Sequence, residues 1–400
     1  MVGRYDVAIV GGGVAGAALG GLLAAAGLGV TVIEKERSFR DRVRGEGIHP
    51  WGVAEAKRLG LLPVLAAAGA NELPIWQSYE DRIPTESYRW AEHSVDGLPE
   101  VAVSHPRLQE ELLNWSRSRG VQVLRPAKAV SMQPNAELTV VQSETARTVS
   151  ARLIVGADGR QSAVSRWIGA TSRRDPTHHR IGGGLIDDVN LAADTTHATN
   201  FPGGRMFLMP QGRGRARVYY VSSTERLATS RADRGPADFI RACAALLPEQ
   251  AFVEATPAGP VAFFPNADVW SSRIAAGAAV LIGDAAGAND PSVGQGLSIL
   301  FRDVRELREL LLDGKDWPGA LAAYAERRRG YYEVLRAHAR WLAMLTTEEG
   351  PRAEARRERV AAARELDPSG GGFALIFARG PDGLVADETA RRRFFGEDAG

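Results

Sequence analysis

The chain has 400 residues, which is longer than one small domain, so its length favours two domains or one large domain with an insertion. Its composition is 44% hydrophobic and 24% charged with a formal net charge of +1, which gives no reason to expect nucleic acid or an anionic membrane surface as a partner. The single cysteine, Cys243, excludes a disulfide framework and the paired cysteines of a flavin disulfide reductase. Charge alone does not identify a substrate.

The N-terminal segment has the pattern of a dinucleotide-binding turn. A run of apolar residues, 7–10, leads directly into Gly11, Gly13 and Gly16, and a charge-free stretch of helical character follows. Gly11 permits the tight turn, Gly13 lets the backbone approach a pyrophosphate, and Gly16 lets the helix pack closely on the strands. The spacing therefore predicts a strand, a turn and a helix that bind an adenine dinucleotide, which could be NAD or FAD.

Neighbouring residues extend this predicted site. The first helical turn, with Val14 and Ala15, offers free backbone N–H groups and the positive end of the helix dipole to phosphates. Glu34 ends the second apolar strand, where a carboxylate is expected to accept hydrogen bonds from ribose hydroxyls, and Lys35 follows it in the same candidate site. Residues 7–33 carry no charge, but their glycines and the lack of a basic leader argue against a signal or membrane segment. We therefore expect a cytoplasmic protein with no membrane partner.

The rest of the chain alternates between helical and strand-like patterns and has no internal repeat. We expect helices at residues 50–61, ended by Pro63, and at 107–119, 237–247, 296–345 and 352–365. We expect strands within 75–103 and at 121–124, 138–141, 153–155, 180–189, 205–209, 217–222 and 278–282. The tail also contains a glycine-rich stretch, 368–372, followed by a short apolar piece that resembles a strand.

The order of these elements predicts an interleaved architecture of the α/β class. A discontinuous dinucleotide-binding domain is expected over residues 1–72, 104–175 and 270–345, and a substrate-binding sheet domain over 73–103 and 176–269 is inserted into it. Residues 346–400 are expected to form a helical tail.

Two later motifs decide between NAD and FAD. The candidate strand at 278–282 leads into Gly283 and Asp284, and an aspartate at this end of a strand can bind the hydroxyls of a ribityl chain, which FAD has and NAD lacks. Gly294 and Gly296 open the next helix and would let its N-terminus approach the pyrimidine edge of a flavin, which stabilises negative charge on the reduced ring. FAD is therefore the predicted cofactor.

Three motifs occur in the order and at the spacing of the class A flavoprotein monooxygenases: Gly11-x-Gly13-x-x-Gly16, Gly156-Ala157-Asp158-Gly159-Arg160 and Gly283-Asp284-Ala285-Ala286. Over about residues 5–345 the chain resembles the para-hydroxybenzoate hydroxylase type of FAD-dependent aromatic hydroxylases. The resemblance implies a Rossmann-like FAD-binding domain with an inserted, mostly antiparallel substrate sheet (an α+β insertion) and a helical C-terminal region. The chain departs from the pattern at Gly287, where many relatives carry histidine.

The same resemblance implies roles for individual residues. Asp158 and Gly159 would serve FAD and, together with Arg160, a transiently bound NADH or NADPH. The other implied contacts with FAD are Arg44, Arg107, the backbone of Val130, Asp284 as the ribityl ligand, and Pro291, whose backbone would lie beside the reactive flavin carbon. The chain has no second dinucleotide fingerprint, which agrees with a nicotinamide donor that binds and leaves.

The family's mechanism implies that NAD(P)H reduces FAD, that O₂ adds at the flavin C4a position, and that the hydroperoxide transfers one oxygen atom to an electron-rich substrate. The aromatic strands near 76–90 and 206–220 suit a flat, largely apolar aromatic molecule bound between the two domains. No acid–base residue and no metal site can be assigned from the sequence, because Tyr219, Tyr220 and His49 are each expected to pack rather than to react.

Other activities of the same fold stay open at this point. Halogenation is disfavoured because the Trp-x-Trp-x-Ile-Pro element of flavin-dependent halogenases is absent. Epoxidases and isoprenoid-type reductases share the features of the FAD site, and a flavin-binding protein without turnover is less consistent with the intact Asp158 and Gly159. The sequence does not choose between NADH and NADPH and does not assign an oligomeric state.

Overall fold

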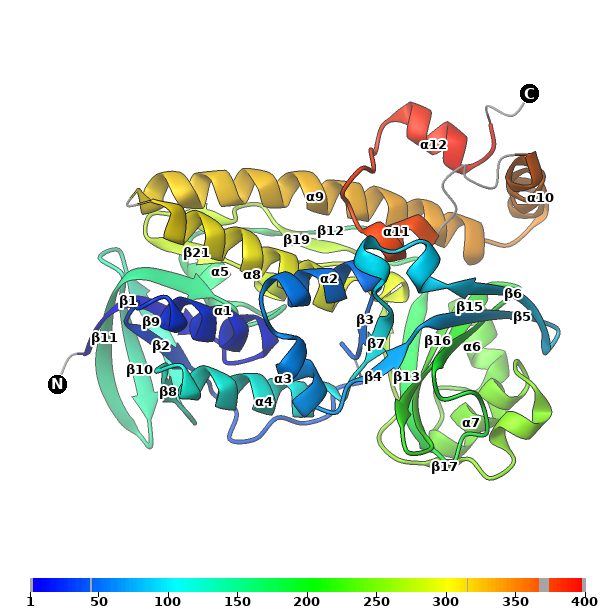
Figure 1. Cartoon of the computed structure of the whole chain (residues 1–400), viewed down its shortest axis with the longest axis horizontal. Helices are drawn as coiled ribbons and strands as arrows, with labels where there is room; N and C mark the ends of the chain where they lie inside the picture. Colours follow the sequence, from blue (N-terminus) through cyan, green and yellow to red (C-terminus); the bar gives the residue numbers. More distant parts are fainter. Residues whose placement is uncertain (1–2, 44, 315, 367–373, 398–400) are drawn as a thin grey trace.

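Two large β-sheets lie next to each other along the long axis of the molecule (Figure 1). The structure is a computed structural model and describes residues 3–43, 45–314, 316–366 and 374–397. Helix α9 (Trp317–Thr346) runs along much of the length of the molecule, and α10 (Pro351–Leu366) and α12 (Glu388–Phe394) lie at the end away from the N-terminus.

The first sheet has the strand order β20-β21-β11-β1-β2-β8. Its strands are β1 (Gly3–Val10), β2 (Val30–Ile33), β8 (Gln122–Leu124), β11 (Thr145–Gly156), β20 (Ala275–Ala276) and β21 (Ala279–Leu281), and β11 also pairs with the antiparallel hairpin of β9 (Lys128–Gln133) and β10 (Glu137–Gln142). The strands β8, β2, β1, β11 and β21 pair in parallel. Their carboxyl ends therefore meet at one edge of the sheet.

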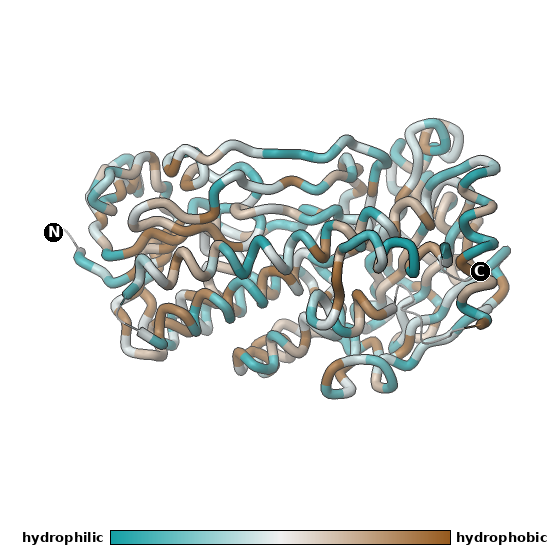
Figure 2. The backbone as a smooth tube through the Cα atoms, turned by 90° about the horizontal axis from the view of Figure 1, so that it is seen from above, coloured by the Kyte–Doolittle hydropathy of each residue, from teal (hydrophilic) through white to brown (hydrophobic). Residues whose placement is uncertain are grey.

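Helices cover the first sheet because its central strands are apolar on both faces. Residues 7–10 and 30–33 are buried, as is typical of parallel strands between helical layers, and Figure 2 shows a concentration of hydrophobic residues in the strands near the N-terminus. On one face lie α1 (Val14–Ala25), α4 (His105–Ser118) and α8 (Gly296–Asp313), and α5 (Ala163–Trp167) packs on the other. The first sheet thus has a hydrophobic core on each of its two faces.

The second sheet, which we call the substrate sheet, has the order β17-β13-β16-β15-β14-β5-β6, and β18 also pairs with β13. Its strands are β5 (Ile75–Glu80), β6 (Ile83–Arg89), β13 (Arg180–Asp187), β14 (Thr195–Phe201), β15 (Gly204–Gly212), β16 (Arg215–Ser222), β17 (Thr256–Pro257) and β18 (Ala262–Pro265). All its pairings are antiparallel except that of β14 with β5.

Side chains alternate between two faces of the substrate sheet. The outer face packs on α6 (Thr224–Ser230) and α7 (Pro236–Ala244), where Tyr220 belongs to a core cluster with Phe239 and Cys243. The inner face, on the opposite side, carries Phe207 and Tyr219, which lie opposite each other on β15 and β16.

Two small sheets and several helices complete the fold. One sheet pairs β3 (Gly47–Ile48), β7 (Glu100–Ala102) and β4 (Asn71–Leu73), and the other pairs β12 (Ser172–Arg174), β19 (Val269–Ser271) and β22 (Gly287–Ala288). The remaining helices are α2 (Pro50–Arg58), α3 (Leu62–Ala67), α11 (Ala374–Arg379) and the 3₁₀ helices η1 (Trp90–Glu92), η2 (Val95–Gly97), η3 (Glu249–Phe252), η4 (Gly283–Ala285) and η5 (Pro291–Val293). In the part of the chain that the structure describes, no helix has the length and apolar character needed to span a bilayer.

The structure corrects three expectations about these elements. The first is that Pro63 ends a helix: α2 already ends at Arg58, and Pro63 lies in the first turn of α3, where proline is well tolerated. The second is the strand-like apolar piece of the tail, because residues 374–379 form α11, whose Phe377 is buried in a cluster of aromatic side chains. The third is the set of expected strands, which did not include β9 and β14. The glycine-rich stretch 368–372 lies outside the described residues.

Candidate active site

The glycine turn after β1 requires its glycines. Gly11 has φ +104°, and a Cβ atom on it would lie 2.3 Å from the carbonyl oxygen of Ala157, while a Cβ on Gly16 would lie 1.9 Å from the carbonyl oxygen of Gly11. Any side chain at these positions would displace the backbone. The N–H groups of the first turn of α1, those of Val14, Ala15 and Gly16, have no acceptor within the helix, because the first intrahelical bond is donated by the residue after them.

The Glu34 carboxylate is held at this turn by backbone groups. Its Oε2 atom accepts a hydrogen bond from the N–H of Gly12 at 2.7 Å, and its Oε1 atom accepts one from the N–H of Glu36 at 2.7 Å. The side chain is buried, whereas the next residue, Lys35, is exposed. The carboxylate thus has a fixed orientation beside the glycine turn, as a ribose ligand needs.

Asp158 and Gly159 follow β11 at the same edge of the sheet. The Oδ2 atom of Asp158 accepts a hydrogen bond from the N–H of Ala163 at the start of α5, 2.6 Å away. Its Oδ1 atom is buried and has no hydrogen-bond partner among the described residues. A buried carboxylate oxygen without a donor is costly, so Oδ1 is well suited to accept a bond from a ligand.

The third motif lies against the other two. Arg160 Nε lies 3.4 Å from Asp284 Oδ2, and a Cβ on Gly283 would lie 3.5 Å from the Cβ of Ala15. The turn at residues 283–284 therefore touches both the start of α1 and the Asp-Gly motif. The structure brings the three glycine-containing motifs together at the carboxyl edge of the first sheet.

Two of the predicted FAD contacts, Arg107 and Val130, are exposed residues, and a third, Arg44, is not described. Arg107 is exposed in the first turn of α4, where its guanidinium packs against Gly69. Val130 is exposed on β9, and the segment before β9 is joined to Glu34 by the bond from the N–H of Ala127 to the carbonyl of Glu34, at 2.7 Å. Arg44 lies outside the described residues. The roles of all three in binding FAD stay predictions.

A buried polar network below the turn at residues 283–284 was missed by sequence reasoning. Asp303 of α8 accepts hydrogen bonds from the N–H of Gly283 at 2.7 Å and from Nε of Arg328 at 3.1 Å, and the Tyr331 hydroxyl also donates to it. Burial raises the pKa of Asp303, and Arg328 opposes this shift. The sequence signal that could have revealed this network is a charged residue on the buried side of each helix, Asp303 on α8 and Arg328 on α9. This network orients the backbone that carries Asp284.

The segment that carries Pro291 is shaped by its own side chains and by His49. Asp290 caps η5, because its Oδ1 atom accepts hydrogen bonds from the N–H and the hydroxyl of Ser292 at 2.8 and 2.7 Å. Gly294 has φ +68°, and a Cβ there would lie 3.1 Å from Nε2 of His49, while no atom lies within 4 Å of a Cβ on Gly296. Gly296 therefore leaves open space at the start of α8.

Two titratable groups adjoin Asp290. The Nε2 atom of His178 lies 2.6 Å from Asp290 Oδ2, and Asp268 Oδ1 accepts a hydrogen bond from the N–H of Asp290 at 3.2 Å. Burial, and then the nearby charge of Asp290, raise the pKa of Asp268 to about 7. Burial opposes protonation of His178, but its bond to Asp290 raises the pKa of the imidazole overall. Asp290 thus has hydrogen-bond partners at both carboxylate oxygens.

The inner face of the substrate sheet combines ion pairs with aromatic rings. Arg217 is fully buried and pairs with Glu46 and with Asp41, whose Oδ2 lies 2.6 Å from its NH2, so the sheet is tied to the chain segment that contains position 44. Tyr219 also approaches Glu46, at 3.4 Å. Burial raises the pKa of the Tyr219 phenol well above its usual value.

Aromatic rings continue from the inner face towards the loop at 293–294. The ring centroids of Phe207 and Trp76 are 5.8 Å apart, those of Trp76 and Phe377 are 6.1 Å apart in a stacked arrangement, and those of Phe377 and His49 are 4.4 Å apart. His49 Nε2 in turn lies 2.9 Å from the carbonyl oxygen of Val293. The tail helix α11 therefore contributes to the surroundings of the candidate site.

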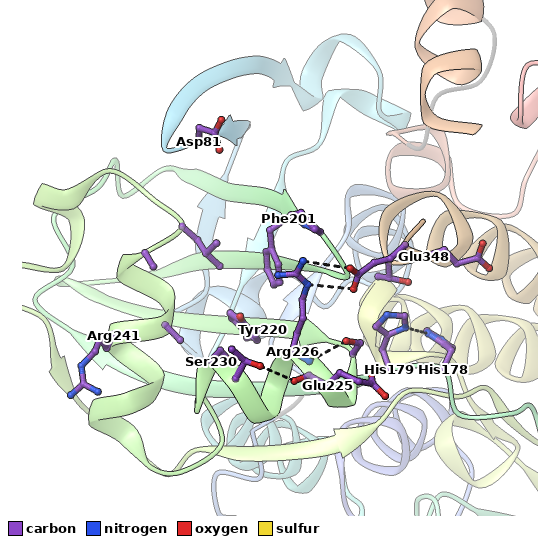
Figure 3. Close-up of a pocket in the computed structure, with 18 residues that line it drawn as sticks. Asp81, His178, His179, Phe201, Tyr220, Glu225, Arg226, Ser230, Arg241 and Glu348 are labelled. Atoms are coloured by element: carbon purple, nitrogen blue, oxygen red, sulfur yellow. Dashed lines mark hydrogen bonds and ion pairs between the residues drawn. The ribbon is translucent and has the colours of Figure 1, made fainter. Parts of the chain in front are cut away.

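A separate open pocket lies on the outer side of the substrate sheet. It has a volume of about 1090 Å³ and lies between α6, α7 and residues 347–349, with Phe201, Tyr220 and His179 in its wall (Figure 3). Arg226 spans its rim through an ion pair with Glu349, at 3.3 Å. None of the predicted cofactor residues lines this pocket.

The residues at the carboxyl edge of the first sheet fit FAD. Asp158 Oδ1 and Gln295 Nε2 are buried polar atoms without partners among the described residues, and the open position at Gly296 leaves room beside the N-terminus of α8. These features suit a ligand with both phosphates and a hydroxylated chain. No group of three or more potential metal ligands is found in the described ranges.

Comparison with known proteins agrees with this geometry. The profile of the FAD binding domain family matches residues 4–338. The chain is 27% identical to a rifampicin monooxygenase from Streptomyces venezuelae over 366 residues (87% of this chain, 73% of the relative) and 26% identical to a menaquinone reductase from Mycolicibacterium smegmatis over 361 residues (81% and 82%).

A solved structure shares the fold. The p-nitrophenol 4-monooxygenase PnpA of Pseudomonas putida superposes with a TM-score of 0.78 at 19% sequence identity, covering 99% of this chain and 98% of the other. The fold expected from the resemblance is therefore confirmed, with its parallel and antiparallel sheets and C-terminal helices. The chain belongs to the FAD binding domain family and is an FAD-dependent monooxygenase of the class A flavoprotein type.

Proposed function

We propose that this protein uses NADH or NADPH and O₂ to hydroxylate a small aromatic substrate, with FAD bound along the carboxyl edge of the first sheet. The observation that carries the proposal is the meeting of three motifs. Gly283 lies against Ala15 in the first turn of α1, and Asp284 lies against Arg160 of the Asp-Gly motif. Bound FAD would supply two-electron reduction and the activation of O₂ for transfer of one oxygen atom.

Each protein group has a distinct task in this proposal. Glu34, fixed by two backbone N–H groups, accepts hydrogen bonds from ribose hydroxyls, and the free N–H groups of α1 bind the pyrophosphate. Asp284 binds the ribityl hydroxyls, and Asp303 holds its backbone in place through Gly283. The open space at Gly296 allows the N-terminus of α8 to approach the flavin ring.

The substrate would bind between the inner face of the substrate sheet and the segment that carries Pro291. The aromatic residues Phe207 and Trp76 suit a flat apolar molecule and exclude water from the reacting atoms. We place the substrate on this face, and not in the outer pocket, because Trp76 and Phe207 of the inner face pack in one apolar cluster with Val293. The domain boundaries and the cytoplasmic location stay predictions.

Purified protein reconstituted with FAD tests the proposal. We expect visible flavin absorption that NADH or NADPH bleaches under anaerobic conditions, and incorporation of one ¹⁸O atom from ¹⁸O₂ into an aromatic product. Asp284→Asn should weaken FAD affinity by at least about tenfold, since a carboxylate acceptor is worth roughly 1.5–3 kcal/mol. The exposed Glu326→Gln makes the same isosteric change on α9 and should leave affinity unchanged.

The possible results separate the candidate activities. Bleaching with no oxygen incorporated into any of a panel of aromatic compounds would contradict hydroxylation and favour a reductase. No bleaching with either nicotinamide would favour a flavin-binding protein without turnover. Unchanged FAD affinity in Asp284→Asn would contradict the ribityl role.

A further inference from the structure

One buried arginine of the inner face, Arg205, has no hydrogen-bond or ion-pair partner among the described residues. Four arginine side chains among the described residues are almost fully buried: Arg205, Arg217, Arg302 and Arg328, with exposed fractions of 3%, 0%, 8% and 1%. Three of them form ion pairs with carboxylates, Arg217 with Glu46, Arg302 with Glu55 and Arg328 with Asp303. Arg205 forms no hydrogen bond or ion pair with a described residue, and its Nε atom is buried without an acceptor.

Arg205 lies where the proposed substrate would bind. It is on β15, two residues before Phe207, and its Cζ atom lies 4.1 Å from the centroid of the Phe207 ring. A guanidinium that stacks on an aromatic ring keeps its N–H edges available for in-plane hydrogen bonds. The Phe207 ring is in contact with Trp76, so the cation stands at the margin of an aromatic surface.

The nearby carboxylate does not satisfy Arg205. The charge of Asp290 acts on Arg205 electrostatically, but both oxygens of Asp290 already have partners, Ser292 at Oδ1 and His178 at Oδ2. Burial lowers the pKa of Arg205 to about 9, and Asp290 opposes this shift only in part. The guanidinium is therefore still protonated at neutral pH, and its desolvation is not compensated by an ion pair in the described part of the chain.

We propose that Arg205 binds an anionic group, a carboxylate or a phenolate, of the aromatic substrate. A planar oxyanion can accept two parallel N–H···O bonds from the guanidinium while its ring packs on the aromatic residues of the inner face. This inference rests on the proposed function, because it specifies that the substrate bound at the same site is an anion. The phosphates of FAD are assigned to the glycine turn of the other sheet, so they do not account for Arg205.

The test uses three pairs of probes that differ only in charge: benzoate and benzamide, 2-naphthoate and 2-naphthamide, and indole-3-acetate and indole-3-acetamide. Binding to the FAD-loaded protein is measured by the change in flavin absorption and fluorescence. We expect at least one acid to bind about tenfold more tightly than its amide, as one charge-assisted pair provides. Arg205→Met should abolish this preference, and Arg205→Lys should keep part of it.

The exposed Arg241→Met is the matched control and should keep the full preference. Thermal unfolding gives an independent measurement: Arg205→Met should be at least as stable as the parent, because it removes an unpaired buried charge, whereas a structural role would make it less stable. A flavin that binds and is bleached, with no acid preferred over its amide or with the preference retained in Arg205→Met, overturns this inference alone. A change confined to the KM for NADPH would assign Arg205 to a phosphate group of NADPH and would also overturn the inference. Absence of bound flavin or of bleaching would instead contradict the proposed function.

Discussion

The two faces of the substrate sheet are built from the same strands but have opposite chemistry. On the outer face, Tyr220 lies in a buried apolar cluster with Phe239 and Cys243 of α7. On the inner face, its neighbour Tyr219 lies beside the Arg217–Glu46 ion pair. Because side chains alternate along a strand, one stretch of sequence can stabilise the domain on one side and bind a ligand on the other.

The two faces also contribute differently to the stability of the folded protein. The outer face gains stability by excluding water from apolar surface, which any side chain of similar shape can do. The inner face contains buried charges: Arg217 forms ion pairs within the chain, whereas Arg205 forms none with the residues that the structure describes. Substitutions on the outer face should therefore affect stability alone, whereas those on the inner face should also affect cofactor or substrate.

The largest expected effect comes from Arg217→Met. It would leave the buried carboxylate of Glu46 unpaired and should lower the free energy of unfolding by about 3–5 kcal/mol. Because Asp41 and Glu46 flank position 44, FAD affinity should fall as well. Urea unfolding and FAD titration measure the two effects.

Phe239→Ala on the outer face is the matched control for Arg217→Met. It creates a cavity that should cost a similar amount, about 3–5 kcal/mol, while the folded fraction keeps its FAD affinity. The double variant Arg217→Met/Glu46→Gln removes the unpaired charge and should recover at least half of the loss. A loss below about 1 kcal/mol in Arg217→Met would contradict the role given to this pair.

An intermediate effect, dependent on pH, is expected for Asp268→Asn beside the inner face. The pKa of Asp268 is about 7 in the folded protein and 3.8 as its ordinary value, so the folded state holds the proton more tightly and the parent loses stability as the pH rises from about 4 to 7. A shift of this size corresponds to about 4 kcal/mol. At pH 8 we expect Asp268→Asn to be more stable than the parent by about half of this free energy. The gain is not complete because an amide oxygen is a weaker acceptor than a carboxylate for the bonds from Asn289 and Asp290.

Thermal or urea unfolding at pH 5 and pH 8 tests this prediction. The difference in stability between Asp268→Asn and the parent should be larger at pH 8, where the parent carries a buried ionised carboxylate. An equal difference at both pH values would contradict the raised pKa.

The smallest effect separates the two neighbouring tyrosines. Tyr219→Phe removes a hydroxyl that is 3.4 Å from Glu46, so we expect a loss of stability of about 1 kcal/mol or less. We also expect substrate-stimulated oxidation of NAD(P)H to slow measurably, but by less than about tenfold, the factor that corresponds to 1.4 kcal/mol. Tyr220→Phe should leave this rate unchanged, and equal effects of the two substitutions on the rate would remove the distinction between the faces.

Local motifs could be predicted from the sequence, and long-range contacts could not. The positions of Gly11, Glu34 and Asp284 at or just after strand ends were predicted correctly, because strand ends and glycine spacing are encoded within short segments. The link between Asp303 and Arg328 joins two helices, and neither residue has a local pattern that indicates its partner. The unpaired state of Arg205 depends on every element around it.

The tail shows a different limit of sequence reasoning. The apolar residues around Phe377 are too few to show helical periodicity, and so they resembled a strand. Their helical form is specified by packing against the aromatic rings of Trp76 and His49, which lie hundreds of residues earlier in the chain. The alanine, leucine and arginine residues of α11 are themselves good helix formers, so tertiary contacts and local propensity agree here, and the short pattern alone was misleading.

Cys243, in the outer core, has a practical consequence for work with this enzyme. Flavin monooxygenases that turn over without transferring oxygen release hydrogen peroxide, which oxidises accessible thiolates. The only thiol of the chain is completely buried, and burial raises its pKa, so little thiolate is present to react. A single cysteine introduced at an exposed position would therefore be the only reactive thiol, which allows a fluorescent or spin label to be attached at one chosen site.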